Sequence, residues 1–582
     1  MSEFNQESFS GGLNLLLDDT RLANNQYRVG FNLRNRYDVL DPVKSSIKDT
    51  SSAIIGLKQG ILTFGEFIIA FVVGKAYFRH YTQTGWNQIP NFLMSTTAPR
   101  FWTVAIPVAV TNYGRLSSTT TDGTNTYNSS LNPVYSTQST AAAFAGNLPG
   151  LLVQDNVSQP QFVYLDGNGY PTARVTQTYN QWTATYDLTP ANYGKLTVDK
   201  REYVPVGSSM AWVDGVLYIT SQDGVSILRS VSGRPLDFVI NVQPNGDKGG
   251  DAFTTAYTVG VGGISCLRGM NDGSLFVAAS NANFAVSKNF SNLAPKEFGE
   301  YTFIRKFLFE ATCLDDRVIF DSLGDTKFID LTGVRSFNAV QQLNNEGRNS
   351  VFTATIAAAF KGVTQKVAAA ILFDNYELYA VDTIFGSAIA VYDTINSSWV
   401  SFDNSQTNGK RIKQFAKIEL GVQRLFAITE DDQLYTLYSS TSTDTASVLS
   451  LGISANMLYN NTNVKMNNPK NEIKLTEFRA ILNRITSSCS ITVQPFIDNR
   501  ESVATTSATK NIKYQAPAIP YTGNIPDLNT QLTNVYWTFP NLEHGWKVAL
   551  LVSWNVGSLT QFSAQLTDIT PMNPLASQGV VT

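Results

Sequence analysis

Charged residues are scarce in this sequence of 582 residues. Only 15% of the residues are Asp, Glu, Lys or Arg, against roughly 25% in an average globular protein. The formal net charge is −3, so the chain has no global basic field of the kind that holds DNA or RNA through phosphate contacts. Much of the surface must consist of Asn, Ser, Thr and Gln, a composition that suits permanent subunit contacts.

Cysteine and histidine are also rare, which limits the available chemistry. The three cysteines, Cys266, Cys313 and Cys489, are odd in number and widely spaced, which fits neither a disulfide framework nor a Cys-x-x-Cys site. We expect them to be buried, reduced thiols. His80 and His544 are not spaced as a pair of metal ligands. The sequence therefore offers too few histidines to favour a histidine metal site or a Ser/His/Asp triad. We expect no metal and no cofactor.

Signals for export or membrane insertion are missing as well. The first residues contain no basic segment followed by an apolar core, so we expect no secretion by a signal peptide. The most apolar stretch, Ile61–Val73, is shorter than the roughly 20 residues that a spanning helix needs, and Glu66 interrupts it. We expect a buried strand there and no membrane span.

What the sequence does contain is a β pattern. Helical periodicity is weak, whereas short runs rich in Val, Ile, Phe, Tyr and Thr recur between Gly, Asp and Asn turn signals. One rhythm of apolar strand, polar turn and apolar-aromatic strand repeats along the chain. Its copies are Phe67–Ile89, Gly207–Ile240, Gly263–Phe290, Phe309–Phe337, Val367–Asp403 and Ile412–Tyr438, with a weaker copy that begins at Leu151.

The turns inside these copies share one chemistry, because residues that tolerate positive φ stand between two apolar strands. We interpret them as hairpin tips: Asp214-Gly215, Asp272-Gly273, Asp315-Asp316, Asp374-Asn375 and Asp431-Asp432. Repeated units of this kind at a spacing of roughly 40 to 60 residues indicate a β-propeller. A protein of several β-sandwiches with similar hairpins is the alternative.

The pattern therefore predicts an all-β fold, a β-propeller of six to eight blades followed by a C-terminal β-sandwich. Residues 1–50 form an N-terminal arm with the first strands, 51–442 the propeller, and 443–582 the sandwich. The stretch 111–147 is dominated by Ser, Thr, Asn, Gly and Ala and is expected to be a polar insertion.

Carboxylate pairs are the first candidates for chemistry, since propellers can carry glycosidase sites built from two acids. Asp315-Asp316 and Glu430-Asp431-Asp432 qualify by residue type, but their equivalent positions in the repeat favour turns. The Ser-x-Asp-x-Gly-x-x-Trp box of sialidase-like propellers is missing. Asp166-Gly167-Asn168-Gly169 is similar to part of a calcium loop, but no Glu follows at the required spacing, so we expect a tight turn. We expect no catalytic site.

Glycine and tryptophan supply the remaining candidates. The chain has no phosphate-binding loop, and Gly260-Val261-Gly262-Gly263 follows no strand-to-helix pattern. Five tryptophans could stack on sugars or pack between blades. Trp86 and Trp399 fall at similar points near blade ends, which favours packing; the others are Trp212, Trp546 and Trp554.

Three segments resemble the β-propeller tail nozzle, or tail tubular, proteins of short-tailed bacteriophages. These segments are Ser8–Pro42, the blade Lys366–Asp403, and the closing strands Glu477–Asn499 and Gly545–Ser563. In that family a Gly-Gly-Leu-Asn stretch, here Gly11–Asn14, precedes a region marked by Asn and Arg. The matching residues are Asn24, Asn25, Asn32, Arg34 and Arg36.

This resemblance implies a virion structural protein, assembled in the bacterial cytoplasm, that forms a homo-oligomeric ring, a hexamer, below the portal and adaptor. Phage DNA would pass through the ring during genome ejection without tight binding. The outer surface would contact tail fibres or receptor-binding proteins. Two alternatives stay open: a carbohydrate- or receptor-binding propeller of a phage tail, and a propeller that hydrolyses glycans.

Overall fold

The computed structural model describes most residues between 2 and 569. The longer stretches outside the description are 17–21, 107–148, 177–183, 188–194, 239–252, 257–262, 289–302, 339–353, 440–454, 461–471, 502–507, 517–529, 540–547 and 570–582. The polar insertion expected at 111–147 lies outside the described residues.

The chain divides into two compact units. Unit 1 consists of Met1–Asp49, Phe352–Lys413 and Arg424–Thr582, and unit 2 of Thr50–Val351 and Gln414–Gln423. Strand β33 (Ile412–Ile418) carries the chain from unit 1 into unit 2. The domain boundaries expected from the sequence stay a prediction.

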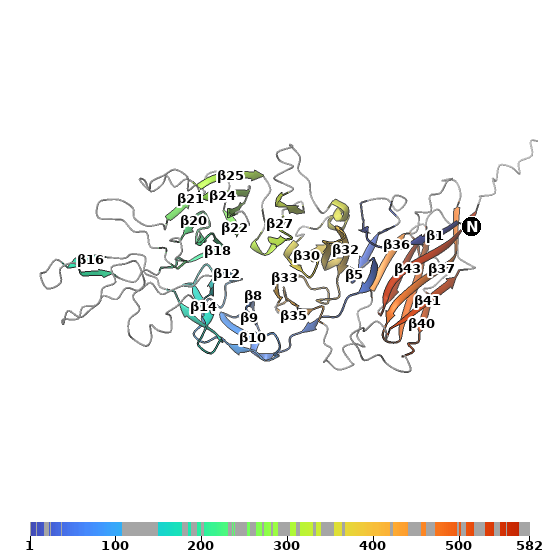
Figure 1. The fold of residues 1–582 in the computed structure, drawn as a ribbon, viewed down its shortest axis with the longest axis horizontal. Helices are drawn as coiled ribbons and strands as arrows, with labels where there is room; N and C mark the ends of the chain where they lie inside the picture. Colours follow the sequence, from blue (N-terminus) through green and yellow to red (C-terminus); the bar gives the residue numbers. More distant parts are fainter. Residues whose placement is uncertain are drawn as a thin grey trace, which may run out of the picture. The chain divides into compact units, whose positions relative to one another are not determined.

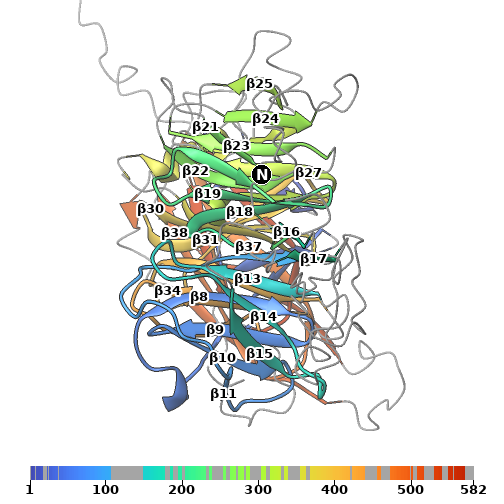
Figure 2. The same ribbon diagram turned by 90° about the vertical axis from the view of Figure 1, so that its left-hand side faces the viewer.

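Unit 2 contains six antiparallel sheets in its described residues (Figures 1 and 2). One is the two-stranded pair of β16 (Ala184–Asp187) and β17 (Lys195–Val198). The other five are the blades, of which four have four strands each and the fifth has three. In order they are β8 (Lys58–Phe64), β9 (Phe67–Val72), β10 (Lys75–His80) and β11 (Asn87–Gln88); β12 (Trp102–Ile106), β13 (Gly150–Gln154), β14 (Gln161–Leu165) and β15 (Pro171–Val175); β18 (Gly207–Val213), β19 (Val216–Ser221), β20 (Ser226–Arg229) and β21 (Phe253–Ala256); β22 (Ile264–Gly269), β23 (Leu275–Ala279), β24 (Asn283–Lys288) and β25 (Phe303–Phe309); and β26 (Phe320–Ser322), β27 (Asp325–Ile329) and β28 (Val334–Ser336).

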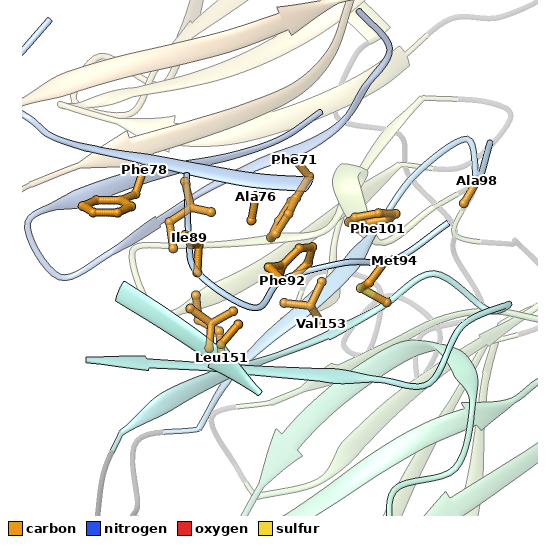
Figure 3. Close-up of a cluster of buried hydrophobic side chains, with 13 residues drawn as sticks. Phe71, Ala76, Phe78, Ile89, Phe92, Met94, Ala98, Phe101, Leu151 and Val153 are labelled. Atoms are coloured by element: carbon orange, nitrogen blue, oxygen red, sulfur yellow. The ribbon is translucent and has the colours of Figure 1, made fainter. Parts of the chain in front are cut away.

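Neighbouring sheets of unit 2 pack face to face through apolar side chains. Figure 3 shows the cluster between the first two sheets, in which Phe71, Phe92 and Phe101 lie against Leu151 and Val153. Similar clusters join the second sheet to the third and the third to the fourth. Sheets buried on both faces need strands that are apolar along their whole length. Every residue of β13 and β23 is buried, and so is every residue of β9 after the first.

Buried and partly buried polar side chains add a second connection between neighbouring blades. Gln414 exchanges two hydrogen bonds with the backbone of Ile61 in β8, at 3.3 and 2.8 Å. Because a buried backbone group without a partner costs free energy, such side chains stabilise the joins between sheets. The pairs are Gln414 with Ile61, Gln59 with Ala98, Gln154 with Gly207, Ser209 with Leu267, and Ser265 with Cys313.

Most of the expected hairpin tips are confirmed. Asp214, Asp374 and Asp432 have positive φ between paired strands, as does Gly273. The Asp315-Asp316 tip is wrong, because Asp315 caps the short 3₁₀ helix η3 (Asp316–Val318) that precedes β26. The buried strand expected over Ile61–Val73 is also wrong in extent, since a turn at Gly65, with φ of 56°, divides the stretch between β8 and β9.

Unit 1 contributes two further blades. One consists of β29 (Val367–Phe373), β30 (Tyr376–Thr383), β31 (Gly386–Asp393) and β32 (Ser398–Asp403). In the other, β34 (Arg424–Thr429) pairs with β35 (Leu434–Leu437), and β35 pairs with the N-terminal strand β7 (Ile47–Lys48). With five blades in unit 2 and two in unit 1 among the described residues, the all-β fold with a β-propeller is confirmed.

Besides the short parallel pair of β2 (Gly12–Leu13) and β3 (Gln26–Tyr27), the rest of the described part of unit 1 is built on two β-sheets to which the first residues of the chain contribute. One sheet consists of β41 (Gln531–Thr538), β37 (Glu472–Ile485), β43 (Ser558–Ile569), β6 (Val39–Pro42) and β5 (Leu33–Arg36), with β1 (Ser2–Gln6) on β43. The other continues from blade strand β32 through β4 (Val29–Phe31), β36 (Ala455–Asn460), β42 (Val548–Trp554) and β38 (Cys489–Ile497) to β39 (Arg500–Glu501), with β40 (Ala508–Ile512) on β38. The two sheets form a sandwich: the Trp537 indole of β41, in the first sheet, donates to the Ala508 carbonyl of β40, in the second, at 3.2 Å, and β37 of the first sheet contacts β42 of the second.

A buried arginine ties the N-terminal strands to blade β29–β32 within unit 1. Arg34 of β5 forms an ion pair with Asp403 of β32 at 2.6 Å, and the two side chains are 8% and 0% exposed. Its guanidinium lies over the rings of Tyr376 and Tyr438, 5.3 and 4.5 Å from their centroids. The Tyr438 hydroxyl donates to Asp403 at 2.6 Å. Charge, ring faces and hydrogen bonds together compensate the desolvation of this pair.

We predict that Arg34→Ala destabilises the protein by about 3–5 kcal/mol, because it leaves Asp403 buried without its counter-charge. Arg36→Ala is the matched control. Arg36 sits on the same strand and approaches Asp374 at 3.6 Å, but both side chains are exposed, so its loss should cost about 0.5 kcal/mol or less. Denaturant unfolding followed by tryptophan fluorescence measures both. Equal stability of the two variants would contradict the prediction.

Candidate functional site

A cluster of ion pairs in unit 2 forms around the carboxylate pair Asp315 and Asp316. Asp315 is the N-cap of η3, and its Oδ1 accepts a hydrogen bond from the backbone N–H of Arg317 at 3.0 Å. Aspartate is among the best residues at this position because its carboxylate satisfies a free N–H of the first turn. Asp316 is the first residue of the turn, so local capping places the two carboxyl groups side by side.

Two arginines hold this pair. Arg100, from the connection before β12, donates to both oxygens of Asp315 at 2.7 and 2.8 Å and also to Asp316. Its guanidinium stacks on Trp102, 4.5 Å from the ring centroid. Arg317 donates to Asp315 from the other side at 2.7 Å. The cluster therefore joins the β11–β12 connection to η3 with two positive and two negative groups.

The two carboxyl groups have widely different pKa values. Burial and the neighbouring Asp315 raise the pKa of Asp316 to about 7, although Arg100 opposes this shift. Burial opposes ionisation of Asp315 as well, but the hydrogen bond to Asp316 and the guanidinium groups of Arg100 and Arg317 outweigh it and hold the pKa of Asp315 well below its usual range. The pair thus shares one proton near neutral pH.

A pair of buried thiols lies beside this cluster. Cys266 of β22 is hydrogen-bonded to Cys313, and this contact together with burial raises the pKa of the Cys266 thiol. Cys313 in turn donates from its Sγ to the Asp315 carbonyl at 3.4 Å. Cys266, Cys313 and Cys489 are buried thiols that form no disulfide with one another, as expected from the sequence. The proximity of Cys266 and Cys313 was not expected, and the raised pKa of Cys266 makes that thiol a poor nucleophile.

The geometry of the carboxylate pair limits its chemistry. In glycosidases the two carboxyl groups stand on either side of the scissile bond, about 5 Å or more apart. Asp315 and Asp316 instead hydrogen-bond to each other, which leaves no room for a sugar between them. Both oxygens of Asp315 are also engaged by guanidinium groups. The arrangement is suited to fixing two segments and to holding a proton.

The second acidic candidate lies in the turn after β34. Glu430 pairs with Arg411, Asp431 accepts a hydrogen bond from the Thr429 hydroxyl, and Asp432 pairs with Lys413 at 2.6 Å. Asp432 has a φ of 58°. The turn expected for Glu430-Asp431-Asp432 is confirmed.

The Asp166 segment is also the tight turn that the sequence indicated. Asp166 Oδ1 accepts from the backbone N–H groups of Asn168 and Tyr170, both at 2.9 Å, and Gly169 has a φ of 79°. Among the described residues, no group of three or more His, Cys, Asp or Glu side chains could hold a metal ion. In the same part of the chain no helix is both long and apolar enough to span a bilayer.

The remaining candidates are divided between packing and the surface. Trp86, Trp399 and Trp554 are buried, and Trp212 is partly buried against an apolar cluster, so packing between strands is confirmed for them. His80 contacts Glu66 at 3.1 Å and Thr82 at 2.7 Å. His544, Trp546 and Gly260–Gly262 lie outside the described residues.

Comparison with known proteins finds no family model and no curated protein that matches this chain. Several solved structures are similar at low scores. A streptogramin B lyase is 9% identical with a TM-score of 0.34, covering 67% of this chain and 96% of its own. YCF48 from Cyanidioschyzon merolae is 10% identical with a TM-score of 0.34, covering 68% and 98%. A β-propeller domain from Myceliophteria thermophila is 7% identical with a TM-score of 0.26, covering 68% and 100%.

We predict that Asp316→Asn stabilises the protein at alkaline pH and not at acidic pH. The folded pKa of Asp316 lies above its ordinary value of 3.8, so the folded chain holds the proton more tightly and stability falls as pH rises from about 4 to about 7. Asparagine imitates the protonated side chain. The gain at about pH 8 should be about 1–3 kcal/mol, measured as unfolding midpoints at several pH values.

Asp315→Asn is the matched control. Because the pKa of Asp315 is depressed, its ionised form supports the fold throughout this pH range, and the substitution should destabilise at both ends. An Asp316→Asn variant whose offset from the unmodified protein is constant between pH 5 and 8 would show that Asp316 does not titrate in this window.

Proposed function

We propose that this chain is a non-enzymatic structural subunit of a short-tailed bacteriophage tail, a nozzle protein of the genome-ejection conduit below the portal and adaptor. One observation carries the proposal. Two residues by which the N-terminus resembles this family, Asn32 and Arg34, hold unit 1 together. Arg34 pairs with Asp403, and the Asn32 amide donates to Asn404 at 2.9 Å while its oxygen accepts from Ser405.

The N-terminal strands give this observation its structural weight. Within the first fifty residues, β5 and β6 join one sandwich sheet, β4 lies between blade strand β32 and β36, and β7 completes a blade. A segment built into three sheets supports a rigid scaffold that transmits load. Such a role fits a subunit of a homo-oligomeric ring that contacts adaptor and fibre proteins in the virion tail.

The candidate chemistry points the same way. The Asp315–Asp316 pair is neutralised by Arg100 and Arg317 and joins two segments of unit 2, so it supports the scaffold more than a hydrolase. The low charge of the whole chain suits large permanent contacts and a channel surface on which a duplex can slide.

The proposal is tested by the mass of the purified protein in solution, alone and with the adaptor, together with virion imaging using an antibody to this chain. We expect a ring, with six subunits as the expected number, and labelling of the tail. A protein that stays monomeric under both conditions and labels no tail would overturn the proposal. Glycan hydrolysis by the monomer, abolished by Asp316→Asn, would favour the enzyme alternative.

We further predict that the isolated protein binds double-stranded DNA negligibly at physiological salt. A conduit that releases DNA quickly cannot hold many phosphates, since each Lys or Arg contact adds a salt-dependent attraction, and the net charge here is −3. Fluorescence anisotropy with a labelled duplex measures this. Micromolar or tighter binding that weakens steeply with salt would refute the sliding-conduit interpretation.

A further inference from the structure

A group of aromatic side chains, of which Tyr170 is exposed and the others are partly buried, lies at the edge of the first two blades of unit 2. Phe67 opens β9, His80 ends β10 with Tyr81 after it, and Tyr170 stands in the turn between β14 and β15. The Phe67 ring lies 5.8 Å from His80 and 6.3 Å from Tyr170, and the His80 ring is tilted against that of Tyr81, with 4.5 Å between the ring centroids. We call Phe67, His80, Tyr81 and Tyr170 the aromatic platform.

A buried phenylalanine holds the platform in place. Phe78, which is buried at one end of the cluster in Figure 3, packs edge-on against Phe67 at 5.5 Å and lies 6.2 Å from Tyr170. Tyr170 nevertheless remains 55% exposed. Phe67, His80 and Tyr81 are partly buried. Tyr170 is therefore held by its ring neighbours and accessible to a ligand.

Hydrogen-bonding groups border the rings. His80 Nε2 contacts the Glu66 carboxylate at 3.1 Å, and Nδ1 contacts the Thr82 hydroxyl at 2.7 Å. The Glu66 side chain remains 60% exposed. Asn168 is exposed beside Tyr170, in a turn that Asp166 fixes through two backbone N–H groups. Fixed aromatic faces with a few convergent polar groups are typical of small-molecule sites.

The charges around the platform select the ligand class. The two carboxylates there belong to Glu66 and Asp166, so the surface disfavours sulfated, phosphorylated or uronic-acid groups through like-charge repulsion. A neutral pyranose offers an apolar C–H face for the rings and hydroxyl groups for the carboxylate, amide and hydroxyl partners. Peptides and nucleobases lack this dense row of hydroxyl donors.

We propose that the aromatic platform is a binding site for neutral carbohydrate, with Tyr170 as the stacking residue and Glu66 as the hydrogen-bonding residue that excludes acidic glycans. The site does not depend on the nozzle proposal, since it lies within unit 2 of one subunit. Preorganised rings make the ordering cost of binding small.

The experiment is affinity electrophoresis of the full chain in native gels cast with neutral polysaccharides (glucan, mannan and galactan) and with acidic ones (alginate and pectate). We expect retardation in at least one neutral gel. Tyr170→Ala should weaken the interaction about tenfold or more, whereas Tyr170→Phe retains the ring and should retain binding. Glu66→Gln should keep neutral binding and increase retardation by the acidic polysaccharides.

The matched control is Tyr536→Ala, which removes a tyrosine of similar exposure, 62%, from β41 of unit 1 and should leave retardation unchanged. Circular dichroism confirms that each variant is folded. Absence of retardation in every neutral gel, stronger retardation of the unmodified protein by acidic gels, or an unaffected Tyr170→Ala variant would each overturn the proposal. If the nozzle proposal holds, these variants should not change the mass of the oligomeric ring. The carbohydrate-site proposal and the nozzle proposal can therefore fail independently of each other.

Discussion

Burial of both faces of a blade is the constraint on which the rest of this structure depends. A blade packed between two others can present neither face to water, so its strands must be apolar along their length. Strand β30 is buried at seven of its eight positions, and β13 and β23 at all five. Charged residues are then left with the turns and the rims. The low charge content of the sequence is thus a consequence of the architecture.

Turns impose a further requirement. Beyond the last hydrogen bond between two strands, the backbone N–H and C=O groups of the turn need other partners. Aspartate does this repeatedly, by accepting N–H groups two or three residues ahead in the same turn, as Asp155, Asp166, Asp223 and Asp393 do. The same residue type therefore marks a hairpin in most places and an ion-pair cluster at Asp315. Only the surroundings distinguish the two: Arg100 is more than two hundred positions away in sequence.

Sequence patterns identified the strands best where the connections are short. The copy Val367–Asp403 matches β29–β32 from its first residue to its last. In the copies Gly207–Ile240 and Gly263–Phe290 the first three strands were contained, but the fourth strands, β21 and β25, follow long connections and fall outside both copies. The blade of β34 and β35 takes β7 from residues 47 and 48, and a local pattern cannot signal a partner so distant.

Aromatic residues show why the candidate sites were harder to identify than the fold. Tryptophan is the residue type that most readily suggests sugar stacking, yet Trp86, Trp399 and Trp554 are buried. Ring type alone does not separate packing from binding; exposure and the fixed position of the ring do. Phe67 and Tyr170 lie about a hundred positions apart and meet because β9 and β14 belong to adjacent blades. An exposed ring held by a buried neighbour is therefore a property of how blades pack, and only the folded chain displays it.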